Sequence, residues 1–172
     1  MNVLEQIAHR ESIRNYDPDR PVDRATLERI LEAGRLAPSA ANRQPWEFLV
    51  VQSPEGLEKV RRCYGRAWLS GAPQVLAVAG NKAEAWVRDY DGYCALETDL
   101  TIAMDHMILA ADHEGVSTCW IANFDPALLR EALALTPGQE VFAITPLGYP
   151  KPDYVKKSAK QRKALSEIVR YL

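Results

Sequence analysis

Apolar residues recur at helical spacing over the longest periodic stretch of the chain, residues 93–114, and Gly115 follows as a natural helix end. Four short apolar runs, at residues 46–52, 74–79, 117–122 and 140–147, have the length of buried strands. A long amphipathic helix among separated strands predicts the α+β fold class, a sandwich of helices around a central sheet. The positions expected to face inward are Leu96, Leu100, Ala103, Met104, Met107, Ile108 and Ala111.

Capping residues predict the other helices. Asp23 is a good N-cap for a helix that runs to about Leu36, and Ser53 precedes Pro54 at a second helix start. Further helices are expected at residues 2–9 and 125–134, whereas residues 165–172 fit either a helix or an edge strand. The length of 172 residues is typical of one domain, residues 1–172, with one core. The chain has no GxGxxG or Walker pattern, which argues against those nucleotide-binding folds.

Composition excludes several classes of function. The three cysteines are odd in number and lack CxxC spacing, which disfavours a disulfide framework or a metal site and fits a reducing cytosol. No signal peptide or membrane span is expected, so we predict a cytoplasmic protein. Residues 151–172 carry seven basic and two acidic residues, against 14 and 21 before them. With few aromatic side chains to stack on bases, this basic tail favours a solvated surface or a phosphate site over nucleic acid.

Residues 38–48 place three neutral hydrogen-bonding side chains, Ser39, Asn42 and Gln44, between Pro38 and Pro45 at the mouth of a predicted strand. Such a density of amide and hydroxyl groups suits a flat ligand with polar edges.

Arg10, Ser12 and Arg14 share one face if their segment is extended. Guanidinium groups bind phosphate and carbonyl oxygens in planar geometry, although a solvated face paired with nearby carboxylates is the alternative. Lys160 and Arg162 form a similar pair in the tail. Trp120 lies in a predicted strand that runs into a helix cap, a place where ligands often meet free backbone N–H groups. The aromatic segment 64–93 is interpreted either as a lid over a flat ring or as packing.

No side chain is predicted to be catalytic. The histidines show neither a nucleophile partner nor metal-ligand spacing, and Cys119 is expected to be a buried structural thiol.

Taken together, these segments resemble the nitroreductase family of FMN-dependent oxidoreductases over nearly the whole chain. Arg10-Glu-Ser-Ile-Arg14 is similar to the Arg-x-Ser-x-Arg/Lys motif of the family, and Pro38-Ser-Ala-Ala-Asn-Arg-Gln-Pro-Trp46 to its Pro-Ser-x-x-Asn-x-Gln-Pro-Trp motif. Residues 115–121, Gly-Val-Ser-Thr-Cys-Trp-Ile, resemble a family strand in which glycine replaces Ser117. Pro146-Leu-Gly-Tyr-Pro150 and Lys160-Gln-Arg162 complete the pattern.

The resemblance implies a mostly antiparallel sheet flanked by helices and a homodimer whose C-terminal segment crosses to the partner as an edge strand. Arg10 and Ser12 would hold the FMN phosphate with Lys160 and Arg162, and Arg14 and Asn42 would address the pyrimidine edge of the flavin. Pro38, Ser39 and Gln44 would reach the flavin of the partner chain. A further segment would follow one flavin face and present a backbone N–H near N5: Trp120, Ile121, Ala122 and Asn123.

The resemblance also implies a reaction. NADH or NADPH would deliver hydride to flavin N5, and a nitroaromatic, quinone or flavin acceptor would then take the electrons in a ping-pong cycle. Dehalogenation, ring dehydrogenation, flavin fragmentation and flavin binding without turnover are the alternatives. The sequence leaves open the physiological acceptor and the choice between the two nicotinamides.

Overall fold

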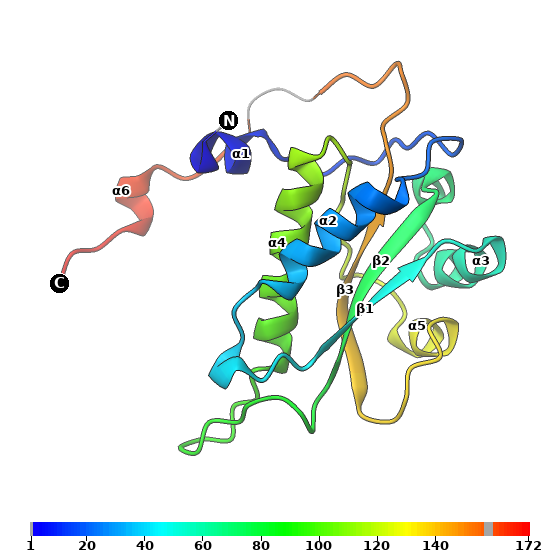
Figure 1. Ribbon diagram of the computed structural model, residues 1–172. Coiled ribbons are helices and arrows are strands. Elements are labelled where there is room, and N and C mark those ends of the chain that lie inside the picture. Colours follow the sequence, from blue (N-terminus) through cyan, green and yellow to red (C-terminus); the bar gives the residue numbers. More distant parts are fainter. Residues whose placement is uncertain (1, 157–159) are drawn as a thin grey trace.

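The computed structural model describes residues 2–156 and 160–172. At its centre, three antiparallel strands pair in the order β1-β2-β3. They are β1 (Trp46–Val51), β2 (Gln74–Asn81) and β3 (Gln139–Leu147). Helices cover both faces of this sheet (Figure 1): α2 (Arg24–Arg35) and α4 (Leu96–His113) on one, α3 (Pro54–Cys63) and α5 (Pro126–Ala132) on the other. The predicted α+β sandwich with an antiparallel sheet is confirmed.

The alternation of side chains along β2 divides the core into two clusters. Leu76 and Val78 pack on the side of α2 and α4, whereas Val75 and Ala77 pack on the side of α3 and α5. Because both faces are covered, nearly every residue of β2 is buried. Full burial of one such aliphatic side chain is worth about 1.5–3 kcal/mol, so this strand anchors both layers.

Asp23 and Ser53, which the sequence predicts as N-caps, are the N-caps of α2 and α3. The Asp23 carboxylate accepts a hydrogen bond from the backbone N–H of Thr26 at 3.0 Å, and Ser53 Oγ accepts one from Gly56 at 3.1 Å. Each bond satisfies a backbone donor that the first helical turn leaves without a partner. At the N-terminus, α1 (Val3–His9) is capped by Asn2 but buries none of its residues.

One predicted strand does not form, and one predicted helix begins later than expected. The prediction of a strand at residues 117–122 fails because this segment makes single bridges to three different partners and no continuous ladder: Ser117 to Gly148, Thr118 to Ser12 and Ile121 to Ile144. The long helix begins at Leu96 instead of residue 93, because residues 86–95 fold into a small hairpin closed by a Val87–Cys94 bridge.

The C-terminal arm, residues 160–172, extends from the body of the molecule (Figure 1) and contains the short helix α6 (Leu165–Ile168). The edge-strand interpretation is therefore wrong for these four residues. Two short 3₁₀ turns, η1 (Ala40–Asn42) and η2 (Ala67–Gly71), complete the elements. No helix within residues 2–156 and 160–172 is long and apolar enough to cross a membrane.

Candidate functional site

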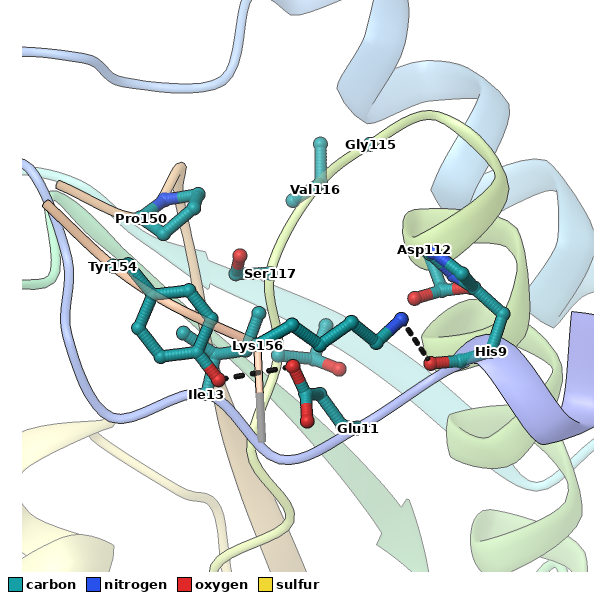
Figure 2. A pocket seen from close by; sticks show the side chains of 11 residues that line it. His9, Glu11, Ile13, Asp112, Gly115, Val116, Ser117, Pro150, Tyr154 and Lys156 are labelled. Carbon is teal, nitrogen blue, oxygen red and sulfur yellow. Dashed lines mark hydrogen bonds and ion pairs between the residues drawn. The ribbon is translucent and has the colours of Figure 1, made fainter. Parts of the chain in front are cut away.

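The segment that follows α1 presents its alternate residues to opposite sides, as predicted for an extended chain. It lies parallel to residues 117–121, where Ser12 pairs with Thr118 and the Ile13 N–H donates to the Thr118 carbonyl at 2.9 Å. Glu11 and Ile13 line one pocket, drawn in Figure 2, whereas Arg10 lines a different hollow. The segment thus separates two spaces.

The hollow on the Arg10 side gathers cations from both ends of the chain. Arg10, Lys160 and Arg162 line it, and its volume is about 620 Å³. Within the described residues, none of these three side chains forms an ion pair with a carboxylate. The alternative of a charge-paired surface therefore fails for Arg10, and the hollow has the charge of an anion site. The other walls are Leu4, Ile7, Ala8, Asp105 and Leu109.

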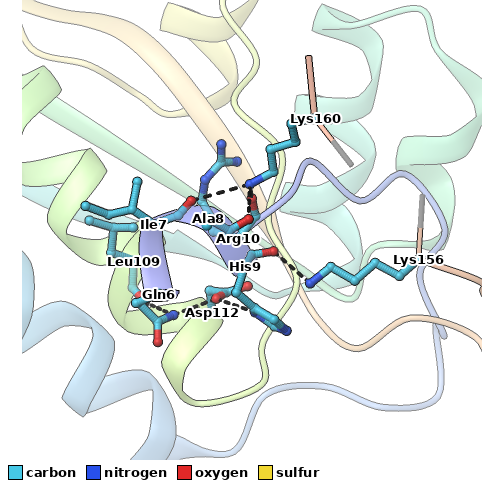
Figure 3. A network of polar contacts seen from close by, with 9 residues as sticks. All are labelled: Gln6, Ile7, Ala8, His9, Arg10, Leu109, Asp112, Lys156 and Lys160. Carbon is cyan, nitrogen blue, oxygen red and sulfur yellow. Dashed lines mark hydrogen bonds and ion pairs between the residues drawn. The ribbon is translucent and has the colours of Figure 1, made fainter. Parts of the chain in front are cut away.

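Lys160 joins the tail to the end of α1. Its Nζ donates to the carbonyls of Ala8 at 2.7 Å and of Arg10, as Figure 3 shows. Carbonyl oxygens at a helix C-terminus carry partial negative charge, so they attract an ammonium group. Burial, and then the nearby charges of Arg10 and Arg162, lower the pKa of Lys160. An anion bound in the hollow would relieve that repulsion.

A strap formed by residues 154–156 holds the Arg10 segment from the opposite side (Figure 2). The Tyr154 hydroxyl donates to Glu11 Oε1 at 3.0 Å, and Lys156 Nζ donates to the His9 carbonyl at 2.7 Å. Burial, and then the bond to Glu11, raise the pKa of Tyr154 to about 12, so the phenol stays a donor. His9 Nδ1 lies 2.8 Å from Asp112 Oδ2 on α4. These contacts fix the backbone that carries Arg10.

Ser12 and Arg14 approach Cys119. Burial raises the pKa of the Cys119 thiol, and Arg14 and Ser12 partly oppose that rise. Cys119 is 1% exposed, which agrees with the prediction of a buried thiol. The next residue, Trp120, is 37% exposed and offers an aromatic surface on the same side as α4.

The other predicted site residues of this segment, Ile121, Ala122 and Asn123, differ in exposure. Ala122 and Asn123 are exposed. Ile121 is buried, and both its N–H and its carbonyl bond to Ile144, at 3.0 and 2.9 Å. The side chain of Ile121 thus lies in the core, and its backbone groups bond β3.

The polar loop at residues 38–44 lies at the other end of α4 (Figure 1). Ser39 Oγ accepts from the Gln44 N–H at 2.9 Å, and Gln44 Nε2 donates to Asn42 Oδ1 at 3.1 Å. The backbone φ is 49° at Ala41, 53° at Asn42 and 51° at Gln44. This left-handed conformation costs roughly 1–2 kcal/mol for residues such as alanine and glutamine, and less for asparagine. Strain of that kind is typical of ligand-binding loops.

The structure separates this loop from the cationic hollow of the same chain. Ala40 in the loop bonds Asp99 near the start of α4, whereas Leu109 near its end lines the hollow. Leu109 follows Asp99 by ten positions, which correspond to about 15 Å along the helix axis. Asn42, which is predicted to address the pyrimidine edge of the flavin together with Arg14, accepts a bond from Gln44 within the loop.

Asp99, Tyr154 and Lys156 were not predicted as site residues. A signal for Asp99 exists in the sequence, because an acidic residue there interrupts the buried stripe that includes Leu96, Leu100 and Ala103. No comparable pattern marks Tyr154 and Lys156, whose partners lie more than 140 positions away in the chain.

The comparisons with known proteins agree on one family. The family model for the nitroreductase family matches residues 7–63 and 60–149. A protein of Archaeoglobus fulgidus, provisionally named NADH dehydrogenase/NAD(P)H nitroreductase, is 33% identical over 156 residues, which are 87% of this chain and 86% of that protein.

Solved structures share the fold over the whole chain. The crystal structure of a nitroreductase family protein from Clostridium difficile 630 matches with a TM-score of 0.87 and 34% identity, covering 99% of this chain and 98% of its own. A Desulfovibrio desulfuricans protein, provisionally named a nitroreductase and solved in complex with FMN, matches with a TM-score of 0.82 and 27% identity. That match covers 100% of this chain and 97% of the other.

Proposed function

The chain belongs to the nitroreductase family, and we propose that it is an FMN-dependent enzyme that transfers hydride from NADH or NADPH to an oxidised small molecule. Membership of the family makes it an oxidoreductase. The observation that carries the proposal is the hollow in which Arg10, Lys160 and Arg162 gather without a carboxylate partner among the described residues. A phosphate dianion complements such a cluster, and a relative of the same fold contains FMN.

The residues of the hollow and its surroundings fit FMN. Arg10, Ser12, Lys160 and Arg162 would hold the phosphate and nearby ribityl oxygens. Arg14 would lie at the pyrimidine edge, where a fixed cation stabilises negative charge that builds on reduction. The segment from Trp120 through Ile121 and Ala122 to Asn123 would line the ring. When bound, FMN supplies the redox chemistry, accepting hydride at N5 and passing electrons on in a ping-pong cycle.

We propose that the site is completed by a second copy of the chain. If two α4 helices lie antiparallel about a two-fold axis, the loop at one helix start meets the cationic hollow at the other helix end. Pro38, Ser39, Asn42 and Gln44 would then contact the FMN held by the partner chain. In this proposal residues 1–172 form one domain. The three free thiols of the chain suit the cytoplasm, which is where we propose that the protein works.

The proposal predicts that the purified protein is yellow, or binds added FMN with a dissociation constant in the micromolar range or below. Bound FMN should be bleached anaerobically by NADH or NADPH and recover its absorbance when a quinone or a nitroaromatic is added. Absorbance spectra in a sealed cuvette measure both steps. A protein that takes up no FMN at millimolar concentration would sink the proposal.

Exposed apolar side chains on α1 and on the C-terminal arm predict the dimer contact. Leu165 and Ile168 on α6 are 70% and 63% exposed, and Leu4 on α1 is 77% exposed. Burial of such leucines and isoleucines against a partner is worth about 1.5–3 kcal/mol each. The double variant Leu165→Asp/Ile168→Asp is therefore expected to shift the protein from dimer to monomer at micromolar concentration.

Light scattering after size-exclusion chromatography measures the change. Leu128→Asp on α5 is the matched control, since that leucine is also exposed but lies on a different layer. A double variant that remains dimeric would contradict the proposed role of α6 in the dimer contact.

A further inference from the structure

The loop at residues 38–44 is strained, yet few hydrogen bonds fix it to the rest of the molecule. Most of the bonds at Ser39, Asn42 and Gln44 stay within the loop. One contact reaches outside the loop, in which the Ala40 N–H donates to Asp99 at 2.9 Å, and the adjoining Pro45 carbonyl accepts from the Asn81 N–H at 3.1 Å. The backbone is thus fixed at Ala40 before the left-handed residues and at Pro45 after them. Of these two contacts, the one at Ala40 uses a side chain, that of Asp99.

Asp99 is unusual for a buried acid. It is 2% exposed, and no ion pair to it is recorded within the described residues. Its Oδ1 accepts from Ala40, whereas its Oδ2 has no hydrogen-bond partner within the described part of the chain. Burial of a carboxyl group costs free energy unless hydrogen bonds or a charge partner offset it, and here one hydrogen bond does so in part.

The surroundings reduce that penalty without removing it. Asp99 lies in the first turn of α4, where the helix dipole favours a negative charge. A charged acceptor also makes a stronger bond to a backbone N–H than a neutral one does. Glu97 shares the same turn but is exposed, so it shares the dipole effect and not the contact with the loop.

We propose that Asp99 is a positioning residue of the FMN site: it holds the loop at residues 38–44 in its strained conformation, so that Ser39, Asn42 and Gln44 meet the flavin of the partner chain. The inference rests on the proposed function. Asp99 touches neither cofactor nor substrate. It acts through the Ala40 N–H, and losing it lets the three left-handed residues relax into ordinary conformations.

The first test is FMN affinity measured by fluorescence quenching. Asp99→Ala is expected to raise the FMN dissociation constant about tenfold, because it removes one charge-assisted hydrogen bond. Asp99→Asn retains an acceptor for the Ala40 N–H and is expected to stay within about threefold of the parent protein. Glu97→Ala, which loses the same charge at the same helix end, is expected to bind FMN as the parent does.

A second variant removes the same bond from the loop side. Ala40→Pro deletes the donor, and proline suits the first position of a helical turn after the extended Ser39 (φ −138°, ψ 157°). Ala40 lies outside the buried core, so this variant tests the contact even where Asp99→Ala fails to fold. It is expected to weaken FMN binding by a similar factor.

Relieving the strain in the loop distinguishes two roles for Asp99: positioning of the loop, and simple support of α4. Glycine adopts left-handed φ without a steric penalty. Ala41→Gly is therefore expected to restore part of the lost affinity in the Asp99→Ala background, leaving a loss of about threefold. Purely additive effects in this double-mutant cycle, or unchanged FMN affinity in both Asp99→Ala and Ala40→Pro, would overturn the inference. Failure of the parent protein to bind FMN would instead overturn the proposed function.

Discussion

Replacing Arg10 with alanine is expected to raise the FMN dissociation constant about 10- to 150-fold, which corresponds to the loss of a charged hydrogen bond worth about 1.5–3 kcal/mol. Arg10 lines the cationic hollow and forms no recorded ion pair with a described carboxylate. The substitution leaves the Arg10 carbonyl in place, so the contact with Lys160 survives. Isothermal titration of the FMN-free protein measures the effect.

Two controls identify the phosphate as the partner of Arg10. Riboflavin lacks the phosphate, so its affinity is expected to be equal in the parent and in Arg10→Ala. Lys156→Ala removes a nearby cation that bonds the His9 carbonyl on the opposite side of the segment, and it is expected to have a smaller effect on FMN. Equal losses for riboflavin and FMN would contradict the phosphate role, because the damage would then not depend on that group.

Gly80→Ala is expected to lower the stability of the FMN-free protein by about 1–3 kcal/mol, the usual result of overpacking a core. A Cβ at Gly80 would lie 2.6 Å from the Pro45 carbonyl oxygen, 2.7 Å from Leu96 Cδ1 and 2.8 Å from Leu100 Cδ2. The leucine side chains can rotate, but the Pro45 carbonyl belongs to the backbone and bonds the Asn81 N–H. The clash therefore also displaces the end of the polar loop.

Urea denaturation monitored by circular dichroism measures this change. Gly65→Ala is the matched control, since an added Cβ there would meet no atom within 4 Å. An unchanged urea midpoint for Gly80→Ala would show that the sheet and the loop can separate without loss of free energy.

The sequence was sufficient to predict most of the fold, because helix starts and buried stripes are local features. Asp23 and Ser53 cap their helices as predicted, and residues 46–52 and 74–79 closely match β1 and β2. The predicted strand at residues 117–122 failed for a non-local reason: its bonding groups are shared between Ser12 near the N-terminus and the region around the end of β3, at Ile144 and Gly148. An apolar run cannot reveal how many partners it will have.

The site was predictable in part. Arg10 and Lys160 were both identified, and the structure brings them to one hollow. The sequence did not reveal that the loop at residues 38–44 is bent by left-handed residues, because alanine at position 41 has no preference for that conformation. Nor did it reveal that α4 separates this loop from Arg10 in one chain, since that distance depends on how helix and sheet pack.

The contact between Lys160 and the end of α1 has a consequence for biosynthesis. Lys160 bonds the Arg10 carbonyl across 150 positions of sequence. A ribosome makes the chain from its N-terminus at about 5–20 residues per second, so Lys160 is made several seconds or more after Arg10. All three strands of the central sheet lie before residue 148, so they are made earlier. In the FMN site proposed above, cofactor binding would therefore wait for residues 160–162, and a product truncated before residue 160 would lack two of the three cations proposed to bind the phosphate.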